Sequence, residues 1–410
     1  MKNFEIHTLG CKLNFSESAA IAARLEAKGW HQGGIPEIIV LNTCAVTQSA
    51  EKKTRNLASK LHRDNPLASI VVVGCYSALK PELLERWSGV IKVFGSANKM
   101  ACVDFIAQEE TDAKSVPAFF DAYSTHDRTR SFLKIQDGCN NHCTYCTVWI
   151  ARGKSRSDSI ENVLKNIKNI ADAGVHEVNL TGVNVGDFGK GTDENLFKLL
   201  KAIVKQNAIE RVRISSIEPD LLTEDIIKLV AKSPILMPHF HIPLQSGCDS
   251  VLLAMRRRYT AQEYADKVAL IKKLMPDACI ACDVITGFPG ETDEDFEETY
   301  HFLEALPISY MHVFTYSRRP RTHANMMDNQ VSEEVKHERT ERLLELSHAK
   351  KMAFYAQCEG QNRPVLVESE VNNDLLSGFT DNYIRVTFPN DESIVNTIQK
   401  VKIEQCRTIL

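Results

Sequence analysis

The stretch GCNNHCTYC, residues 138–146, decides the fold of the central part of the chain. Its three cysteines, Cys139, Cys143 and Cys146, have the spacing Cys-x₃-Cys-x₂-Cys. Three thiolates can hold three irons of a cubane iron–sulfur cluster and leave the fourth iron open, whereas electron-transfer clusters take four cysteines. The alternatives are core cysteines gathered by chance or a zinc knuckle without its fourth ligand, and His142 directly before Cys143 suits zinc poorly. The spacing therefore predicts a cluster with an open, catalytic iron.

Strand and helix patterns alternate around this stretch and predict an incomplete (β/α)6 barrel over residues 131–357. FLKIQD (132–137) leads directly into the cysteine loop. The other expected strands are HEVNLTG (176–182), RVRISS (211–216), HFHIPL (239–244), CIACDVITG (279–287) and YMHVFTY (310–316). Helices are expected at 160–170, 195–206, 223–232, 261–274, 292–305 and 332–357. The active site of such a barrel belongs at the carboxyl ends of its strands, where the cysteine loop lies.

The first 110 residues predict a separate domain, an N-terminal open parallel α/β sheet. Its expected strands are 4–9, 37–42 and 69–74, and its expected helices are 16–28, capped by Ser16, then 49–62 and one after Pro81. Cys11, Cys44 and Cys75 each follow a strand by one to three residues. Because ligands of open α/β sheets bind beyond the carboxyl ends of the strands, these cysteines are expected to form a second three-cysteine site. Three unrelated buried thiols are the alternative.

The remaining segments complete a three-domain organisation. Residues 111–130 contain proline, serine and threonine and are expected to be a linker. The short alternating strands PVLVES, NYIRVTF and KVKIE predict a small β-barrel over residues 358–410.

Composition indicates a protein of a reducing compartment. Twelve cysteines in 410 residues are too few for a disulfide scaffold, and MKNFEIHTLGC lacks the apolar core of a secretion signal. No apolar run approaches the roughly 20 residues that span a bilayer. We therefore expect a cytoplasmic protein without a membrane segment. The formal net charge is −4, so contact with a polyanion must come from local basic patches such as residues 256–258.

Two further patterns are expected to be structural. Cys279 and Cys282 form a CxxC, but they lie within a predicted strand, where positions three apart face opposite sides. His239 and His241 lie on another expected strand, and a lone histidine there is more often part of the core than a ligand. We keep these four residues out of the predicted site.

The two cysteine trios together resemble the signature of radical S-adenosylmethionine (SAM) methylthiotransferases. The resemblance covers essentially the whole chain and implies a C-terminal TRAM-like barrel. It also implies an auxiliary 4Fe–4S cluster on the N-terminal trio and a SAM-binding 4Fe–4S cluster on the central trio. Within the family, HTLGCKLN (7–14), LNTCAVTQSAEKKTR (41–55) and VVGCY (72–76) look most like the branch that modifies N6-threonylcarbamoyladenosine in tRNA.

The resemblance implies a reaction in two halves. One SAM methylates sulfur held at the auxiliary cluster; a second SAM yields a 5′-deoxyadenosyl radical that removes hydrogen from carbon-2 of the modified adenine beside the anticodon. The implied partners are the tRNA anticodon loop and an electron donor such as a flavodoxin or ferredoxin. The rivals are enzymes that act on isopentenyladenosine in tRNA or on an aspartate of a ribosomal protein. A rival of another class is a non-catalytic iron–sulfur RNA-binding protein.

The same resemblance implies which strand ends and loops contact SAM. Gly182 would let the backbone approach the ligand closely. Asn184, Ser216 and Gln245 would offer amide or hydroxyl groups at three strand ends, and Tyr145 lies inside the cysteine loop.

The substrate named by the resemblance carries a carboxylate, which isopentenyladenosine lacks. An arginine suits a carboxylate best, through a charge-assisted, bidentate hydrogen bond. The candidates are Arg152, close after the cysteine loop, and Arg318 or Arg319, at the end of the last expected barrel strand. The alternative is that these arginines contact phosphates or face solvent.

Overall fold

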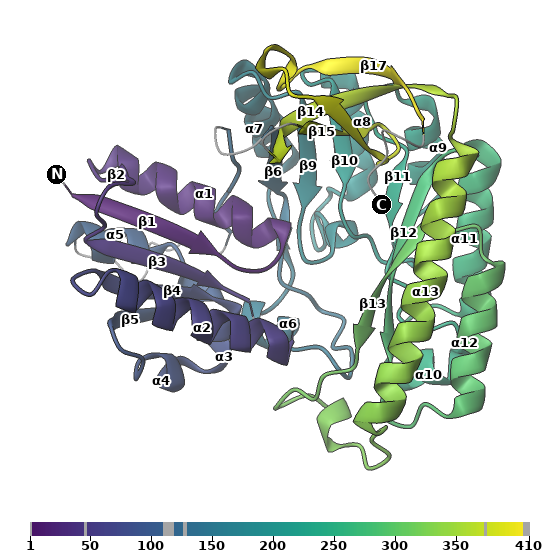
Figure 1. The fold of residues 1–410 in the computed structure, drawn as a ribbon, viewed down its shortest axis with the longest axis horizontal. Helices are drawn as coiled ribbons and strands as arrows, with labels where there is room; N and C mark the ends of the chain where they lie inside the picture. The colour runs from purple at the N-terminus through teal and green to yellow at the C-terminus, as the bar shows by residue number, and fades with distance from the viewer. Residues whose placement is uncertain (1, 45–46, 110–118, 126–128, 373–374, 405–410) are drawn as a thin grey trace.

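The computed structural model describes residues 2–44, 47–109, 119–125, 129–372 and 375–404. An α/β part at the N-terminus lies beside a central partial barrel, and a small antiparallel sheet formed by the C-terminal residues lies over one end of that barrel (Figure 1). In the described part of the chain, no helix is both long and apolar enough to cross a membrane.

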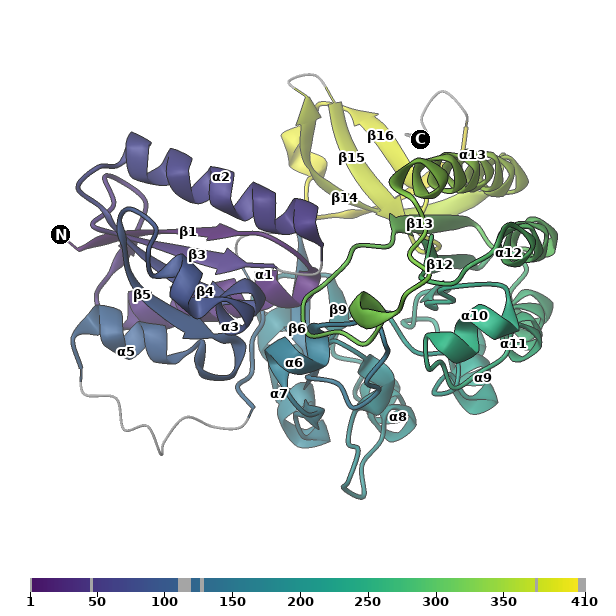
Figure 2. The same ribbon diagram turned by 90° about the horizontal axis from the view of Figure 1, so that it is seen from below.

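The N-terminal part is built on a parallel sheet with strand order β2-β1-β3-β4-β5. Helices cover both faces, with α1 and α5 on one side and α2 on the other (Figure 2). This confirms the predicted open sheet. The strands are β1 (Asn3–Thr8), β2 (His31–Gln32), β3 (Ile38–Thr43), β4 (Ser69–Gly74) and β5 (Val90–Gly95). The helices are α1 (Lys12–Ala27), α2 (Gln48–Asp64), α3 (Cys75–Leu79), α4 (Pro81–Leu84), the 3-10 turn η1 (Ser96–Asn98) and α5 (Ala101–Ala107).

The start of α1 differs from the expected one. The helix begins at Lys12 with Cys11 at its N-cap, so the predicted cap at Ser16 is wrong. Ser16 lies inside the helix, where its hydroxyl donates to the carbonyl oxygen of Leu13 at 2.9 Å. The correction places Cys11 directly at the N-terminus of a helix.

The central part has six parallel strands in two three-stranded sheets, ordered β10-β9-β6 and β11-β12-β13. The amide of Ile217, after β10, donates to the carbonyl oxygen of His241 at 3.1 Å and joins the two sheets. Together they form the expected partial barrel, which is open between β6 and β13. The strands are β6 (Arg130–Lys134), β9 (Glu177–Thr181), β10 (Arg211–Ile214), β11 (His239–His241), β12 (Cys279–Thr286) and β13 (Tyr310–Thr315).

Helices cover the outer side of these strands. They are α7 (Ile160–Asp172), α8 (Leu196–Gln206), α9 (Glu224–Lys232), α10 (Asp249–Ala254), α11 (Ala261–Leu274), α12 (Asp293–Ala305) and α13 (Glu333–Gln357), with 3-10 turns η2 (Val185–Asp187) and η3 (Ala324–Met326). The apolar residues of each strand, such as Val178, Val212 and Val284, pack against these helices. Because side chains alternate along a strand, the residues between them face the lumen, and most of these are polar.

The cysteine loop is closed at its base by a short hairpin. β7 (Gln136–Asp137) pairs antiparallel with β8 (Arg156–Ser157), and α6 (Val148–Arg152) lies between the cysteines and β8. The loop therefore starts and ends at one point beyond the carboxyl end of β6.

The C-terminal sheet is antiparallel, with order β16-β15-β14-β17, and it curls into a half-barrel. This confirms the expected small barrel, but with four strands where three were predicted. The strands are β14 (Asn362–Asn372), β15 (Leu375–Thr380), β16 (Arg385–Pro389) and β17 (Ile398–Lys402), with the turn η4 (Glu392–Ile394). Arg211 and Arg213 at the amino end of β10 donate to the carbonyl oxygen of Thr380 at 2.9 and 2.6 Å, so the half-barrel closes this end of the lumen.

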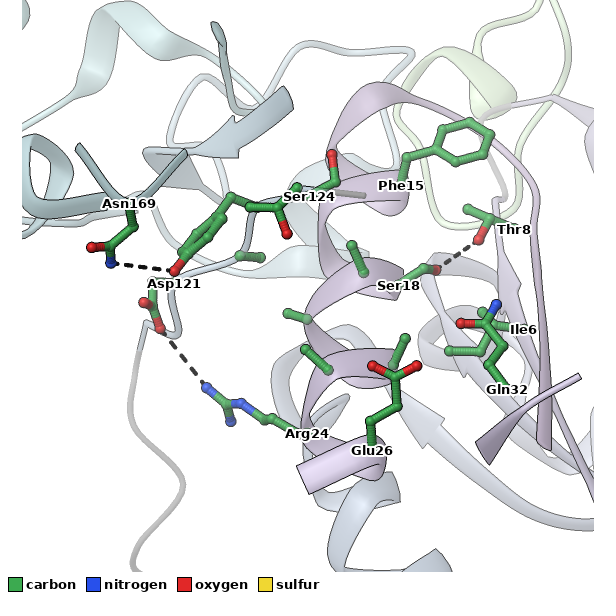
Figure 3. Close-up of a pocket in the computed structure, with 17 residues that line it drawn as sticks. Ile6, Thr8, Phe15, Ser18, Arg24, Glu26, Gln32, Asp121, Ser124 and Asn169 are labelled. Atoms are coloured by element: carbon green, nitrogen blue, oxygen red, sulfur yellow. Dashed lines mark hydrogen bonds and ion pairs between the residues drawn. The ribbon is translucent and has the colours of Figure 1, made fainter. Parts of the chain in front are cut away.

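A cavity of about 670 Å³ lies between α1, β1 and residues 121–125 (Figure 3). Thr8 and Ser18 form a hydrogen bond of 2.7 Å on its wall, and Arg24 approaches Asp121 to 3.8 Å. None of the predicted site residues lines it, so we assign the chemistry elsewhere.

Candidate active site

The central cysteine trio lies in a loop that supplies a hydrogen bond to each sulfur. The amides of Asn141 and Val148 donate to the sulfurs of Cys139 and Cys146 at 3.4 Å, and Arg257 donates to the sulfur of Cys143 at 3.2 Å. Hydrogen bonds to the sulfurs are one of the ways in which proteins tune iron–sulfur clusters.

Burial raises the pKa of Cys139 to about 11 and that of Cys146 to about 12. Metal ligands must be deprotonated, so a metal bound here replaces the thiol protons. Among the described residues, two groups of possible metal ligands have all their ligand atoms within 4.8 Å of one another, and neither group is a cysteine trio. At least one pair of sulfurs in each cysteine trio is therefore more than 4.8 Å apart. Three sulfurs on one zinc ion, each about 2.3 Å from it, lie within about 4.6 Å of one another. The spacing thus fits a cluster of several irons.

The N-terminal cysteines lie at the carboxyl ends of three neighbouring strands, β1, β3 and β4. Gly10 has a left-handed φ of +118°, and a Cβ there would come within 2.8 Å of the Cβ of Cys44. Only glycine therefore allows the loop that carries Cys11 to pack against Cys44. Cys75 is the first residue of α3, and its sulfur accepts a hydrogen bond of 3.7 Å from Ser96. The loops of all three cysteines thus lie at one edge of the sheet.

The two trios lie on either side of one interface. Ala151 in α6, five residues after Cys146, packs in the same apolar cluster as Cys75 and Tyr76 of α3. The arrangement brings the loop of the central trio against the N-terminal part (Figure 1).

A buried ionic network holds this interface together, and Arg152 is its centre. Its guanidinium donates to both carboxylate oxygens of Glu17 at 3.1 Å, to Asp137 at 2.8 Å and to Asn14 at 2.7 Å. Lys134 also contacts Glu17, at 3.1 Å. Burial alone would raise the pKa of Glu17, but the charges of Arg152, Lys99 and Lys134 hold it well below its ordinary value. These contacts use the N–H groups that Arg152 would need to bind a substrate carboxylate, so they favour a structural role for Arg152.

The other two arginine candidates also have protein partners. Arg319 is buried and forms an ion pair with Glu51 of α2, so it too joins the barrel to the N-terminal part. Arg318 is exposed and donates to the side chain and carbonyl oxygens of Asn325 at 3.2 and 3.1 Å. Neither geometry favours the expected carboxylate contact.

The close approach at Gly182 is made by a protein side chain. A Cβ at this position would come within 2.8 Å of Oε1 of Gln136. That oxygen accepts from the amides of Val183 and Asn184 at 3.0 and 2.9 Å, while the amide nitrogen of Gln136 donates to the carbonyl oxygen of Gly138 at 2.8 Å. Gln136 therefore ties the end of β9 to the cysteine loop, and the missing Cβ of Gly182 lets its side chain approach.

Asn184 does fit a ligand contact. Its side chain is buried, and neither its amide nitrogen nor its oxygen has a hydrogen-bond partner among the described residues. Buried polar groups are normally paired, so these two atoms mark a place where a polar ligand would be bound.

The remaining SAM candidates are placed around the same end of the barrel. The carbonyl oxygen of Ser216 accepts from Val185 at 3.3 Å. Gln245 has a left-handed φ of +74°, a conformation that costs free energy in a non-glycine residue. The hydroxyl oxygen of Tyr145 lies 3.5 Å from Nη1 of Arg257.

Sequence reasoning missed Arg257 and Glu218 as a pair at the cluster. Arg257 bridges Cys143 and Glu218 and also donates to the hydroxyl of Tyr259 at 2.9 Å. Its side chain is only 3% exposed, although Arg256 and Arg258 on either side are exposed. A run of three arginines indicates a solvated face, and nothing in the run itself distinguishes the middle one.

Comparisons with known proteins agree with this geometry. Residues 133–303 match the Radical SAM superfamily, and residues 3–95 match the Uncharacterized protein family UPF0004. The chain is 37% identical to the "Threonylcarbamoyladenosine tRNA methylthiotransferase MtaB" of Bacillus subtilis, over 98% of this chain and 94% of that protein. It is 32% identical to a "tRNA-2-methylthio-N(6)-dimethylallyladenosine synthase" of Clostridium botulinum, over 99% and 94%.

The fold is also found in solved structures. The radical SAM methyltransferase TsrM from Kitasatospora setae superposes with a TM-score of 0.58 at 13% identity, over 80% of this chain and 77% of that chain. This likeness concerns the fold alone. The identities to curated relatives over nearly the full length show that the chain belongs to the radical SAM methylthiotransferase family.

Proposed function

We propose that this chain is a tRNA methylthiotransferase that adds a methylthio group to carbon-2 of N6-threonylcarbamoyladenosine beside the anticodon. The observation that carries the proposal is the position of two three-cysteine sites on the two sides of one interface, at the carboxyl ends of two sets of parallel strands. The names of the relatives at 36–37% identity support the choice of modified base.

When bound, two 4Fe–4S clusters and SAM supply methylated sulfur and the reductive cleavage of SAM that starts radical chemistry. Cys139, Cys143 and Cys146 would hold the SAM-binding cluster, and Cys11, Cys44 and Cys75 the auxiliary one. The chain's own residues orient these groups. Arg257 places a positive charge beside the sulfur of Cys143, and Glu218 holds that guanidinium in place. Asn184 offers its unpaired side-chain amide to SAM.

The chemistry of the lumen supports threonylcarbamoyladenosine over isopentenyladenosine. Its wall includes Asn179, Arg213, His241, Asp283 and His312, each of which alternates with apolar residues that face the helices. An isopentenyl group gains free energy from apolar walls, whereas a threonylcarbamoyl group brings a carboxylate and a hydroxyl that need polar partners.

The proposed partners are the single-stranded anticodon loop of tRNA and a one-electron donor such as a flavodoxin or ferredoxin. An unpaired loop allows the target base to turn out of its stack at low cost. A tRNA-modifying role would place the protein in the cytoplasm.

Mass spectrometry of tRNA nucleosides tests the proposal. A deletion strain should lose 2-methylthio-N6-threonylcarbamoyladenosine and regain it with the wild-type gene. A variant with Cys11, Cys44 and Cys75 replaced by alanine should still cleave SAM but form no methylthio product. Loss of methylthio-isopentenyladenosine in the deletion strain, or an unchanged nucleoside profile, would exclude the proposed substrate.

A further inference from the structure

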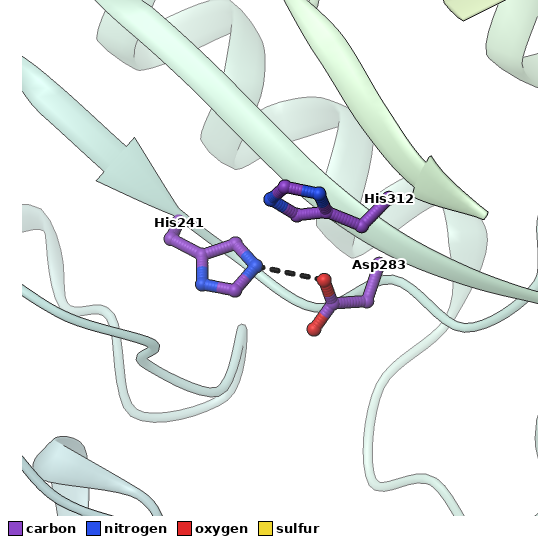
Figure 4. Close-up of side chains that lie close together, drawn as sticks. All are labelled: His241, Asp283 and His312. Carbon is purple, nitrogen blue, oxygen red and sulfur yellow. Dashed lines mark hydrogen bonds and ion pairs between the residues drawn. The ribbon is translucent and has the colours of Figure 1, made fainter. Parts of the chain in front are cut away.

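Three side chains of the barrel lumen, His241, Asp283 and His312, form a group that the cluster chemistry does not use; we call it the lumen triad. Its members come from the neighbouring strands β11, β12 and β13. Asp283 pairs in register with His312, and His241 pairs with Ala281, two residues before Asp283 on the same strand. Because side chains alternate along a strand, all three lie on the lumen face, and Figure 4 shows them close together.

The separations within the lumen triad suit one metal ion. Nε2 of His241 lies 2.8 Å from Oδ1 of Asp283, and one ligand atom from each of the three residues lies within 4.8 Å of the other two. Ligands about 2.1 Å from an octahedral ion are about 3 Å apart at right angles and about 4.2 Å apart across the ion. A tetrahedral ion would need about 3.4 Å between neighbouring ligands. The short separation of His241 and Asp283 therefore favours an octahedral ion.

The charge of Asp283 also calls for a cation. Its side chain is only 20% exposed, and its ion-pair partner is His241, which carries a charge only when it is protonated. In the described part of the chain, no lysine or arginine forms an ion pair with Asp283. Arg213, a lumen arginine of β10, is bound by Glu177 at 2.7 Å instead. A carboxylate withdrawn from water is normally paired with a cation or a metal ion.

The ring of His312 can supply the third ligand. It meets the rings of Tyr310 and His241 edge-on, with centroids 5.3 and 5.5 Å apart. Neither of its nitrogens has a hydrogen-bond partner among the residues that the structure describes. Two imidazoles and one carboxylate form a ligand set that holds a first-row metal ion and leaves further positions of the ion open.

A second group of possible ligands, Cys248, Asp295 and Glu298, is equally compact, but its central carboxylate is already occupied. Oδ2 of Asp295 accepts from the amide of Thr292 at 2.9 Å at the start of α12, and Oδ1 accepts from the hydroxyl of Ser250 at 2.9 Å. A metal ion there would have to compete with both hydrogen bonds. The lumen triad has one internal hydrogen bond to replace, so it is the better candidate.

We propose that the lumen triad binds a divalent first-row metal ion with octahedral geometry, such as Mn²⁺ or Fe²⁺, in addition to the two iron–sulfur clusters. Nε2 of His241, Oδ1 of Asp283 and a ring nitrogen of His312 are its protein ligands. The other positions of the ion face the lumen and take water or the oxygen atoms of a bound ligand. His241 is thus a metal ligand and not the core histidine that its place on a strand suggests.

A titration with Mn²⁺ tests this site in the reconstituted holoenzyme without RNA. Free Mn²⁺ gives an electron paramagnetic resonance signal that weakens on binding, and the wild-type protein should bind one ion per chain. His312→Ala and Asp283→Asn should each weaken this binding by at least about 10-fold, since losing even a group that only orients a ligand weakens metal binding about 10- to 100-fold. His337→Ala is the matched control and should bind as wild type. His337 and Glu341 form an exposed pair on α13, 3.2 Å apart, that belongs to neither of the compact groups found among the described residues.

Pulsed electron paramagnetic resonance identifies the ligands, because the nitrogen of a bound imidazole couples to the electron spin of Mn²⁺. This coupling should be present in wild type and in His337→Ala, and it should weaken in His241→Ala and His312→Ala. Iron content at the wild-type value shows that each variant is folded. The proposal is wrong if the wild type binds no stoichiometric Mn²⁺, if the variants bind it equally well, or if the bound ion shows no nitrogen coupling. The proposed tRNA substrate is not involved in these measurements, so its test by nucleoside analysis stands apart.

Discussion

Arg257 is the side chain that would act most directly on the proposed SAM-binding cluster. It contacts a cysteine sulfur on one side and Glu218 on the other, in a site where both side chains are largely buried. Burial raises the pKa of Glu218, and the charge of Arg257 opposes that rise. A positive charge beside a cluster favours its reduced form, which carries the more negative charge.

We therefore expect Arg257→Met to lower the reduction potential of the SAM-binding cluster by about 60 mV, which corresponds to about 1.4 kcal/mol for one electron. SAM cleavage should slow while iron content stays unchanged. Potentiometric titration followed by electron paramagnetic resonance measures the shift. Arg258→Met, on the exposed neighbour, is the control, and a potential that is the same in both variants would contradict the assignment.

For Asn184 we predict opposite effects on the stability of the SAM-free protein and on its affinity for SAM. Asn184→Leu removes two buried polar atoms that lack partners, so the SAM-free protein should become more stable, by about 1 kcal/mol. SAM affinity should fall by about 1–2 kcal/mol, because the ligand loses its hydrogen bonds. Thermal unfolding and equilibrium SAM binding give the two values. A variant with unchanged SAM affinity would show that Asn184 faces no ligand.

At the scale of elements, the carboxyl ends of parallel strands organise both cysteine trios. The barrel strands and their helices could be predicted from alternating apolar patterns, and α11 has the bounds Ala261–Leu274 that the sequence indicates. The two-residue strand β2, the partly exposed β5 and the glycine-containing β15 could not, because none shows a regular alternation of apolar and polar residues. Cys279 and Cys282 pack in two different apolar clusters, as expected for positions on opposite faces of a strand.

The cysteines at these strand ends allow the most direct test of which residues bind the clusters. Replacing Cys139, Cys143 and Cys146 with alanine should lower the iron content from about eight to about four per chain, since each trio would hold one four-iron cluster. SAM cleavage should be lost at the same time. Cys248→Ala, a buried cysteine of the barrel outside both trios, should keep all the iron. Full iron content in the triple variant would mean that these three cysteines are not ligands.

At the scale of the whole molecule, the contacts that matter most join residues far apart in the chain. Arg152 meets Glu17 across 135 positions, and Arg319 meets Glu51 across 268. Sequence patterns report local structure, so they could not show that these arginines would be engaged by the N-terminal part.

The buried network at Glu17 makes stability depend on pH. Its pKa is lowered in the folded state, so its contribution is present above the unfolded value of about 4.3 and is lost as pH falls below it. Glu17→Gln removes the carboxylate that the buried Lys99, Lys134 and Arg152 share and should cost about 3–5 kcal/mol at pH 7. The difference in the free energy of unfolding between Glu17→Gln and wild type should shrink below about pH 4.

Thermal unfolding midpoints at several pH values measure this difference. Glu26→Gln, on the exposed side of the same helix, is the control and should behave as wild type throughout. A Glu17→Gln variant that is equally destabilised at pH 7 and below pH 4 would show that the loss comes from packing and not from charge.

The two ion pairs of Arg152 and Arg319 also limit how the enzyme can move. Both are buried, and together they fasten the N-terminal part to the barrel at two separate points of one interface. A hinge between the two parts would have to break both, so the separation of the two cysteine trios is set before any substrate arrives. The enzyme is therefore rigid across this interface, and the movement that brings the base to the sulfur has to come from the RNA.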